Sequence, residues 1–404
     1  MISNCAVKTT SLVKSSDGKH YKKINYQSVI GEVKKSFKAK YSIIQAHIAG
    51  ACIKKHVDSF NGCVELKNKN MDKNYDRPVN LPHEHDDGCL HNIIIPKESI
   101  TSSKKKLEKG YIELPLSREY KKKLESSDCR PRIDIPENIR DKKIIQVEII
   151  PVCNGRMFKA NFTYQIEKEP LDLDKNKVMG IDIGVNNFAT IVTTEGTPFI
   201  VDGRFLKNQI AFRCKKIAHY QSILDQQGLK KSKRIDNINN RFKGIQNNFL
   251  NHTVKFIIET CKEQDIGTII LGYNNNFQYK SNMGKKQNQI FSQIAFKQFK
   301  EKLETQTQKH DITLIIQEES YTSKSSFLDN DILPTYDENQ KGKKYEFKGK
   351  RIYRGLYKTQ KGKLLNADVN AAANIIRKSK QKFNFERLYK WAQTAPSKIK
   401  PHKI

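Results

Sequence analysis

The spacing of apolar residues divides the chain into two regions. Residues 39–60 carry apolar side chains three or four positions apart, which predicts one amphipathic helix. Between about residues 61 and 170, short segments alternate apolar and polar positions and are separated by turn residues, which predicts a small β-barrel or sandwich. Residues 1–170 are therefore expected to form an N-terminal region of helices followed by strands.

A different pattern begins at Lys177. Three strand-like segments follow one another closely (KVMGIDIGVNN, FATIVTT and PFIVDG), and two long helical stretches follow at 205–225 and 233–264. A buried strand (GTIILGY), a helix at about 289–306, a strand (DITLIIQEE) and a helix (NADVNAAANIIRK) complete the series. Three antiparallel strands, then helix, strand, helix, strand and helix is the order of an RNase H-like α/β domain, expected here over residues 171–380.

Two insertions interrupt this predicted domain. The apolar seam of the second long helix predicts that it packs on the preceding helix as a hairpin over 205–264. A basic, glycine-containing segment over 325–365 predicts a β-hairpin with interleaved aromatic and basic residues, a pattern that favours contact with a nucleic-acid strand. Its expected core consists of Tyr345, Phe347, Ile352, Tyr353, Leu356 and Tyr357. The residues expected to contact nucleic acid are Lys231, Lys233, Arg234 and Arg241 in the first insertion and Lys350, Arg351 and Arg354 in the second. Residues 381–404 are expected to be a basic, partly disordered tail.

The chain is strongly basic. Its 404 residues include 74 Lys and Arg against 43 Asp and Glu, a formal net charge of +31. Such an excess costs self-repulsion in the folded state, and a polyanion partner relieves it with release of counterions. A lysine-rich compositional bias would raise the lysine count but would not leave the acidic residues so few. The charge therefore predicts a nucleic-acid partner and argues against an enzyme that acts only on small molecules.

No apolar run approaches the ~20 residues that a membrane-spanning helix needs, and the first residues have no apolar signal-peptide core. We therefore expect no membrane partner and a cytoplasmic, nucleoid-associated location, or a nuclear one in a eukaryotic or viral host. The eight cysteines include no Cys-x-x-Cys pair. One cluster, His83, His85, Cys89 and His91, matches no common zinc spacing, so we interpret it as a polar surface turn.

Hydrolysis of a phosphodiester needs its attacking and leaving oxygens stabilised together, and two divalent ions about 4 Å apart, held by carboxylates, do this. Asp182 lies in the apolar strand segment GIDIGVNN, where a carboxylate is costly to bury unless it is paired or metal-bound. Gly180 and Gly184, on the same face, are expected to leave room for phosphate or metal. The alternative is a strand-end Asp that caps a turn.

A second candidate carboxylate, Asp368, begins the predicted helix NADVNAAANI. An Asp at a helix start is most often only an N-cap. Val369, Ala372 and Ile376, however, form a stripe that would lay this helix on the sheet and direct Asp368 toward the same edge as Asp182. The two motifs together are more specific than either alone.

The motifs GIDIGVNN, YTSKSSFLD and NADVNAAANI resemble the TnpB/OrfB family of transposon-associated proteins, which is related to the type V CRISPR nucleases and the eukaryotic Fanzor proteins. The resemblance covers about residues 178–378. It extends more loosely to the N-terminal region, which would correspond to the family's recognition helices and its oligonucleotide-binding-like wedge barrel. It implies an RNA-guided DNA endonuclease with a RuvC-like Asp, Glu, Asp site and two Mg²⁺ or Mn²⁺ ions. The implied partners are a guide RNA from the transposon end and a double-stranded DNA target. The protein and its guide RNA are expected to form a ribonucleoprotein with one copy of the protein.

The chain departs from most of the family in the position of the glutamate. The usual position ends the strand that corresponds to GTIILGY, where this chain has Gly272. Adjacent strands lie about 4.8 Å apart, so a glutamate that closes the next strand reaches the same metal, as in family members with a relocated glutamate. Glu319 fits this pattern better than Glu318, and only one of the two can serve because successive strand residues face opposite ways. The expected metal-binding and catalytic carboxylates are Asp182, Glu319 and Asp368.

A second departure concerns zinc. Many relatives carry two Cys-x-x-Cys pairs before the last motif, whereas here Ser326 and Asp329 take the places of the first pair and no cysteine follows Cys261. We therefore expect no zinc ribbon. Two other functions stay open at this stage: an RNA-guided DNA-binding protein that has lost cleavage, which Gly272 keeps in view, and a DNA-binding transposase without a guide RNA.

Overall fold

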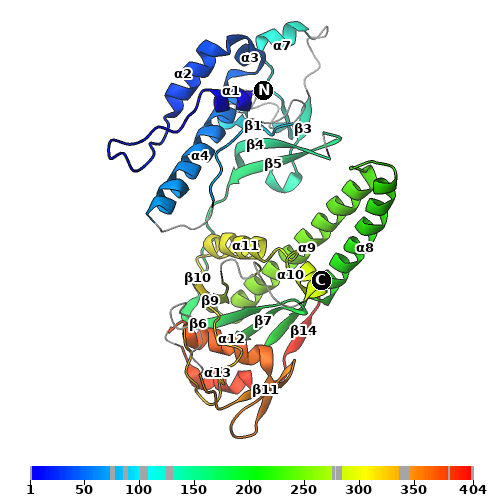
Figure 1. Ribbon diagram of the computed structural model, residues 1–404. Helices are drawn as coiled ribbons and strands as arrows, with labels where there is room; N and C mark the ends of the chain where they lie inside the picture. Colours follow the sequence, from blue (N-terminus) through cyan, green and yellow to red (C-terminus); the bar gives the residue numbers. More distant parts are fainter. Residues whose placement is uncertain are drawn as a thin grey trace. The chain divides into compact units, whose positions relative to one another are not determined.

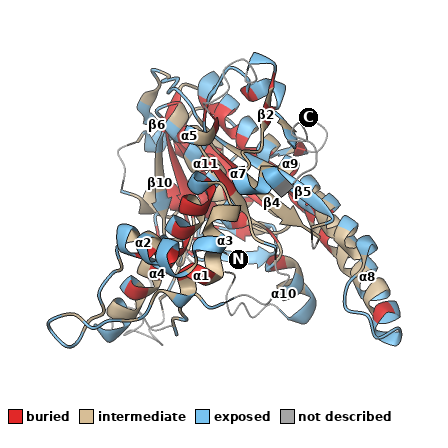
Figure 2. Cartoon of the chain, turned by 90° about the horizontal axis from the view of Figure 1, so that it is seen from above, coloured by how far each residue is buried: buried red, intermediate tan, exposed pale blue. Residues whose placement is uncertain are grey.

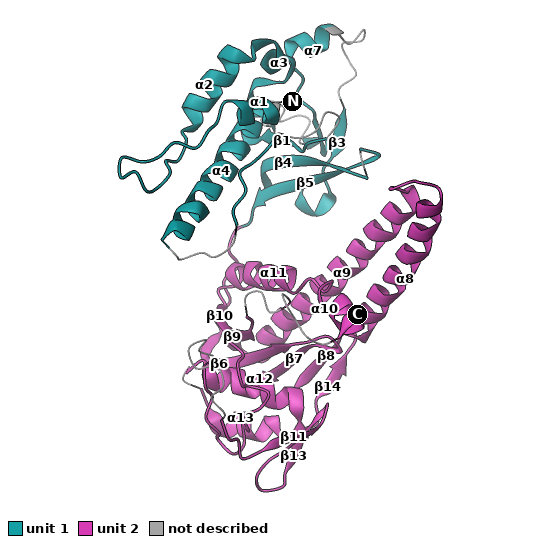
Figure 3. Cartoon of the chain, in the orientation of Figure 1, with its two compact units in different colours: residues 1–166 teal, residues 167–404 magenta. Residues whose placement is uncertain are grey.

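The computed structural model divides the chain into two compact units, Met1–Ile166 and Glu167–Ile404 (Figure 3). The residues that it describes are 2–72, 78–84, 90–100, 108–123, 131–153, 155–274, 278, 284–335, 345–380 and 383–401. Among these residues, no helix combines the length and the apolar character that crossing a membrane would require.

The first unit begins with helices. The predicted single helix over 39–60 is wrong: the chain forms α3 and then, after an extended Ile44 (φ −99°, ψ 143°), the longer α4. Gln45 caps α4, because its side-chain oxygen accepts from the amide of Ile48 at 3.0 Å. The helices of this part are α1 (Ile2–Lys8), α2 (Tyr26–Ser36), α3 (Lys38–Ile43) and α4 (Ala46–Met71) (Figure 1). They share a core that includes Val29, Val33, Ile53 and Val57.

The strands of the first unit form two separate sheets among the described residues, not one continuous barrel. One sheet is antiparallel with the order β1-β4-β5, and the other pairs β2 with β3 only. The strands are β1 (Ile93–Pro96), β2 (Tyr111–Glu113), β3 (Arg132–Asp134), β4 (Lys143–Val152) and β5 (Met157–Gln165). Short helical segments lie between them, namely α5 (Lys97–Ile100), α7 (Arg118–Lys123) and η2 (Glu137–Ile139).

The second unit is built on a six-stranded sheet with the order β10-β9-β6-β7-β8-β14. The three strands predicted from the first motif form an antiparallel meander, and β9 and β10 run parallel to β6. The strands are β6 (Asp174–Ile183), β7 (Asn187–Thr193), β8 (Phe199–Asp202), β9 (Ile266–Gly272), β10 (Thr313–Gln317) and β14 (Ser397–Ile399). β7 and β9 are almost wholly buried. Figure 2 shows buried residues, in red, beside β6 and β10.

Helices cover both faces of this sheet. Alternate residues of β6 face opposite ways, so that Met179 and Ile181 pack in the core with α9 and α11, while Val178 packs in the core with α12 and α13. α8 (Arg204–Gln226) and α9 (Lys233–Glu263) form the predicted hairpin. The helix expected at 289–306 is two helices, α10 (Lys285–Phe291) and α11 (Phe296–Lys309). The helices on the other face are α12 (Ala367–Lys378) and α13 (Phe385–Ala392).

Two parts of the C-terminal region differ from expectation. The tail is not simply disordered, because α13 buries Leu388 and Ala392 against the sheet and β14 pairs with β8. The insertion forms a three-stranded antiparallel sheet of β11 (Lys350–Tyr353), β12 (Leu356–Lys358) and β13 (Leu364–Asn366). Of its expected aromatic core, Tyr357 is fully buried, whereas Tyr353 is 74% exposed and points away from that core.

Candidate active site

Asp182 lies near the end of β6, on the face that α12 covers. It pairs with Thr190 of β7, and the preceding residue pairs with Leu271 of β9, so Asp182 lies beside Gly272 at this edge of the sheet. Asp182 is largely buried, with part of the residue still exposed to solvent. The sheet register therefore fixes this carboxylate at the position where β6 and β9 both end.

The glycines that flank Asp182 make room for protein, not for a ligand as expected. A Cβ at Gly180 would lie 2.5 Å from Cγ1 of Ile376 and 2.7 Å from the carbonyl oxygen of Ala372, so this glycine allows α12 to approach β6 closely. A Cβ at Gly184 would lie 2.8 Å from the carbonyl oxygen of Asn187. Gly180 thus brings the helix that carries Asp368 onto the strand that carries Asp182.

Glu319 follows the end of β10 and reaches across to β9. Gln317 pairs with Gly272, and the amide of Glu319 donates to the side-chain oxygen of Asn274 at 3.2 Å. The Oε1 atom of Glu319 lies 2.6 Å from the point where a Cβ of residue 272 would be. The carboxylate of Glu319 therefore fills the space that the missing side chain of Gly272 leaves free, beside Asp182.

Glu318 is held in a different environment. Its Oε2 atom accepts a short hydrogen bond from the ammonium group of Lys378, and its Oε1 atom accepts from the amide of Ser320 at 2.7 Å. Both oxygens of Glu318 are thus bound, whereas the buried Oε1 of Glu319 has no hydrogen-bond partner within the described residues. The two neighbouring glutamates therefore differ in whether a carboxylate oxygen is left without a hydrogen-bond donor and can accept a cation.

Asp368 lies in the first turn of α12 but does not cap it. The cap is Asn366, whose side-chain oxygen accepts from the amides of Asp368 at 3.0 Å and Val369 at 3.1 Å. The Asp368 side chain accepts at Oδ2 from the amide group of Asn187 at 2.7 Å and at Oδ1 from the guanidinium of Arg351 at 3.0 Å. The start of α12, the first residue of β7 and β11 therefore meet at this carboxylate.

The charges of Glu319 and Asp368 act on Asp182. Burial, followed by the charges of Glu319 and Asp368, raises the pKa of Asp182 well above its usual value, and Arg351 lowers it in part. Burial and then the charge of Glu318 raise the pKa of Glu319 to about 7, while Lys378 opposes this rise. Raised pKa values at neighbouring carboxylates show that their charged forms are unfavourable there, and a bound cation would stabilise these charged forms.

The donor set fits a hard divalent cation. Carboxylate oxygens are the ligands that Mg²⁺ prefers, and Glu319 offers a buried oxygen without a partner. Across the described parts of the chain, no group of three or more His, Cys, Asp or Glu is already spaced as a metal cage. Asp368 accepts hydrogen bonds from Arg351 and Asn187 instead, so an ion would have to compete with Arg351 for this ligand.

The residues predicted to contact nucleic acid lie in two places. Lys233, Arg234 and Arg241 are exposed on α9, and the guanidinium of Arg234 lies over the ring of Tyr220 at 4.9 Å. Lys231 is exposed just before that helix. In the second insertion Lys350, Arg351 and Arg354 are all exposed, and Arg351 also binds Asp368. The sequence suggested only a nucleic-acid contact for Arg351 and gave no sign of its pairing with Asp368.

Ser326 and Asp329, which take the places of the first cysteine pair, are joined by a hydrogen bond. The hydroxyl of Ser326 donates to Oδ2 of Asp329 at 2.6 Å, and the same oxygen accepts from the amide of Gln360 at 2.8 Å. Asp331 accepts from the amides of Ser326 and Lys348 at 2.9 and 3.1 Å. Of the His/Cys cluster noted above, His85 and Cys89 lie outside the described residues.

Sequence reasoning missed several polar residues around the site. Asn187 binds Asp368, and Asn274 binds the backbone of Glu319. Three more lie on α12 at four-residue spacing, namely Asn370, Asn374 and Lys378. The repeated spacing in NADVNAAANIIRK was visible in the sequence and indicates one polar face of this helix.

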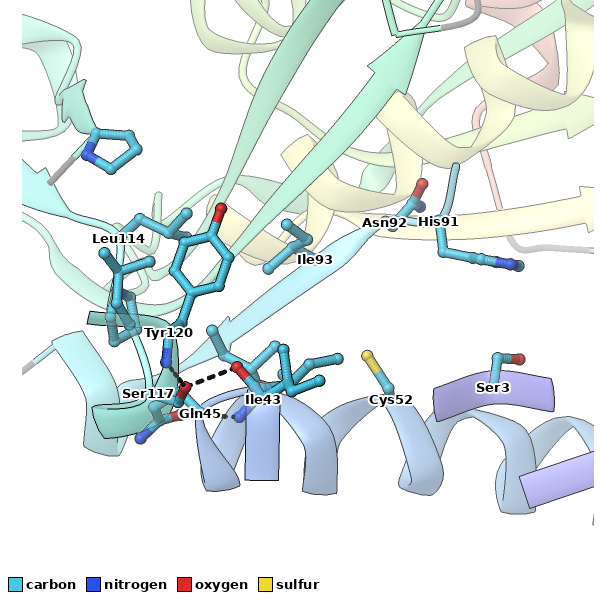
Figure 4. A pocket seen from close by; sticks show the side chains of 15 residues that line it. Ser3, Ile43, Gln45, Cys52, His91, Asn92, Ile93, Leu114, Ser117 and Tyr120 are labelled. Carbon is cyan, nitrogen blue, oxygen red and sulfur yellow. Dashed lines mark hydrogen bonds between the residues drawn. The ribbon is translucent and has the colours of Figure 1, made fainter. Parts of the chain in front are cut away.

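The first unit contains a separate cavity of about 470 Å³, lined mainly by apolar side chains (Figure 4). At its edge the hydroxyl of Ser117 donates to the carbonyl oxygen of Ile43 at 2.6 Å and accepts from the amide of Tyr120 at 3.0 Å. No Asp or Glu is among its lining residues. The carboxylates of the second unit are therefore the better candidates for hydrolytic chemistry.

Comparisons with known proteins find similarity to transposon-associated proteins over two parts of this α/β chain. A family model described as probable transposase (OrfB_IS605) matches residues 161–278, and a Cas12f1-like TNB domain model matches residues 296–375. The first range contains Asp182, and the second contains Glu319 and Asp368. Over these residues the chain is similar to the TnpB/OrfB family and to the Cas12f1-like proteins.

Individual relatives are distant. The TnpB-like protein ORF457 of Acidianus two-tailed virus is 24% identical over 236 residues, which cover 55% of this chain and 46% of that protein. The chain thus matches less than half the length of this curated relative. Among solved structures, the Cas12f1 chain of a complex with sgRNA and target DNA has a TM-score of 0.47 at 13% identity, covering 87% of this chain and 75% of that one. A CRISPR-Cas12f ternary complex has a TM-score of 0.33 at 14% identity, covering 87% and 74%.

Proposed function

We propose that this protein is an RNA-guided DNA endonuclease whose second unit is an RNase H-like (RuvC-like) nuclease domain. An antiparallel meander followed by two parallel strands, with helices on both faces, supports this assignment. The two matched family models, OrfB_IS605 and the Cas12f1-like TNB domain, lie almost entirely within the same unit. The first unit, with its helices and small sheets, is proposed to supply the recognition and wedge regions.

The observation that carries the proposal is the meeting of Glu319 with Gly272 beside Asp182. The position where the family usually has its glutamate is Gly272 in this chain. The side chain of Glu319 occupies the space beside this glycine, and its buried Oε1 atom has no hydrogen-bond partner among the described residues. A drifting, inactive chain has no physical reason to retain such a replacement. This argues for a working nuclease over a protein that only binds DNA.

Asp182, Glu319 and Asp368 would hold Mg²⁺ or Mn²⁺, which supplies charge neutralisation and an activated water at the scissile phosphate. In this scheme Asp182 is fixed by the sheet, Asp368 by the capped start of α12, and Glu319 by the contacts of the segment after β10. Asn187 orients Asp368, and Arg351 neutralises that carboxylate until substrate and metal arrive.

The proposed partners are a guide RNA derived from the transposon end and a double-stranded DNA target, bound by a monomeric ribonucleoprotein. Base pairing would supply sequence specificity, so the protein needs mainly contacts to the sugar-phosphate backbone. A net charge of +31 and exposed basic residues on two elements agree with this division of labour.

The test is to express the protein with its flanking DNA, recover the ribonucleoprotein, and assay cleavage of a target that matches the bound RNA. We expect the wild type and, at saturating Mg²⁺, Glu318→Ala to cut, whereas Asp182→Ala and Glu319→Ala keep the RNA but cut at least 100-fold more slowly, as for loss of an essential metal ligand. Bound RNA without cutting by the wild type would favour the repressor-like protein. Copurified DNA without RNA of defined ends would favour a transposase that uses no guide.

A further inference from the structure

One face of α12 holds the whole segment that follows β10. Three polar side chains, spaced four residues apart along the helix, bind residues 318–327 in reverse order along the chain. They are Asn370, Asn374 and Lys378. Side chains four apart lie on one face of a helix, so these three form a polar ladder beside the edge of the sheet that carries the candidate site.

Lys378 is the end of this ladder nearest Glu319. Its side chain is only 6% exposed, and its ammonium group donates to Oε2 of Glu318, to the carbonyl oxygen of Ser320 at 2.8 Å and to that of Pro334 at 3.0 Å. A buried ammonium group is costly unless its donors are satisfied, and here all three donors have an acceptor. Lys378 therefore binds the residues on both sides of Glu319 in the sequence.

Asn374 supports the same segment one turn earlier. Its side-chain nitrogen donates to the carbonyl oxygens of Thr322 at 2.9 Å and Ser325 at 2.7 Å. Thr322 in turn donates through its hydroxyl to the carbonyl oxygen of Glu319 at 2.8 Å. The backbone of Glu319 is thus tied to α12 through Thr322, although Glu319 lies beyond the last residue of β10.

We propose that Lys378 is a positioning residue that commits Glu319, and not Glu318, to the metal-binding edge of the sheet. The carboxylate of Glu318 is held against α12 while the carboxylate of the next residue, Glu319, lies at Gly272, so fixing Glu318 also fixes the direction of Glu319. A glutamate on β9 would be fixed by the sheet itself, whereas a glutamate after β10 needs this external support. The inference rests on the proposed function, because it assigns Lys378 a role in the same metal site.

The test measures Mn²⁺ affinity directly, by electron paramagnetic resonance of free Mn²⁺, and the Mg²⁺ concentration at half-maximal cleavage by the ribonucleoprotein. Lys378→Met keeps the aliphatic volume and removes the ammonium group. We expect it to weaken Mn²⁺ binding and to raise the Mg²⁺ midpoint by about tenfold, in the range found when groups that orient metal ligands are removed. Lys380→Met, an exposed lysine two residues further on, is the control for lost charge and should leave both values unchanged.

A second variant separates positioning from simple charge balance. Lys378→Met combined with Glu318→Gln removes the carboxylate that the single variant leaves without its lysine partner, and so also covers the case in which the single variant fails to fold. If Lys378 positions Glu319, the double variant recovers thermal stability but keeps the raised Mg²⁺ midpoint. A midpoint restored to the wild-type value, or a single variant that binds Mn²⁺ as the wild type does, would overturn the proposal. Failure of the proposed function itself looks different, because Asp182→Ala would then bind Mn²⁺ like the wild type.

Discussion

The carboxylate of Glu319 lies where a side chain of Gly272 would begin. Its Oε1 atom is 2.6 Å from the position of the Cβ atom that this glycine lacks. The side chain of Ile375 borders the same point. Gly272 is the last residue of β9, and Glu319 follows the end of β10, the parallel strand beside it. The absence of a side chain at 272 is therefore a condition for the position of Glu319.

This relationship predicts the effect of Gly272→Ala. The added methyl group would displace Glu319 without altering any charge, and a displacement of about 1 Å at a catalytic group can cost on the order of 100-fold in rate. We expect cleavage to fall by about this factor while RNA binding is kept. The measurement is single-turnover cleavage by the reconstituted ribonucleoprotein.

Gly244→Ala is the matched control for this substitution. Gly244 lies inside α9, and a Cβ there would have no neighbour within 4 Å. Alanine in a helix interior should stabilise the protein by about 0.5–1 kcal/mol and leave cleavage unchanged. Equal activity of the two alanine variants would show that the Gly272 position does not constrain the site.

Returning the carboxylate to β9 tests the same relationship in the opposite direction. Glu319→Ala removes the side chain that fills the space, and Gly272→Glu then provides a carboxylate from the neighbouring strand. We expect the double variant to cleave faster than either single variant, by about tenfold or more, although below the wild type because the end of the Ile375 side chain must move. A double variant no better than Glu319→Ala would show that the two positions are not interchangeable.

The pKa of Glu319 predicts a pH dependence of stability in the absence of divalent ions. Its folded-state pKa is raised from 4.5 to about 7, so its contribution to stability is fully present below pH 4.5 and is lost as the pH rises through about 7. Glu319→Gln does not titrate and should lack this loss. In chelator, we expect the variant to exceed the wild type in unfolding free energy at pH 8 by about 3 kcal/mol, with little difference near pH 4.

Chemical unfolding at several pH values provides the measurement. A divalent ion should stabilise the wild type at pH 8 and leave Glu319→Gln nearly unaffected, because the ion binds only the carboxylate form. Parallel stability curves for the two proteins would mean that Glu319 is not in a desolvated, like-charged environment.

Arg351 is expected to compete with divalent ions for Asp368. Its guanidinium donates to Oδ1 of Asp368 at 3.0 Å, and both side chains are partly exposed. Pairs of this kind contribute about 0.5–1 kcal/mol, so Arg351→Gln should tighten Mn²⁺ binding by about two- to five-fold in the absence of nucleic acid. Titration calorimetry measures this change, and weaker binding by the variant would show that Arg351 supports the ion instead of displacing it.

The sequence predicted the sheet of the second unit well because its signals are local. Buried parallel strands such as β9 are uninterrupted apolar runs, and the α8–α9 hairpin has a long apolar seam. The same reasoning joined α3 and α4 wrongly, because the extended Ile44 and the Gln45 cap interrupt a pattern whose apolar spacing continues. It also left out β14, whose three residues form a strand only through pairing with β8.

The candidate site was predictable to the level of its acidic residues but not to the level of its contacts. Motif order identified Asp182 and Asp368, and strand alternation reduced the glutamates to two. The contact that separates the environments of Glu318 and Glu319 comes from Lys378, which lies 60 positions away in the chain and gives no local signal. Likewise, Gly180 could be recognised as a close-approach position, but that α12 approaches there required the three-dimensional structure.

The basic residues on α9 predict a change in the salt dependence of nucleic-acid binding. Lys233, Arg241 and Lys243 are exposed along this helix. If each contacts a phosphate, replacing all three with Gln should lower the slope of log K against log salt by about 2 to 3 and weaken binding of both the RNA and the DNA target. Filter binding at several salt concentrations measures the slope.

Three other lysines provide the control, because each already pairs with a glutamate: Lys255 with Glu259 at 3.6 Å, Lys297 with Glu301 at 3.8 Å and Lys309 with Glu169 at 2.9 Å. Replacing these three with Gln removes the same formal charge from the chain. If binding depends only on net charge, the two triple variants should behave alike. If Lys233, Arg241 and Lys243 contact phosphates directly, only their replacement should lower the slope, and the control should keep the wild-type value.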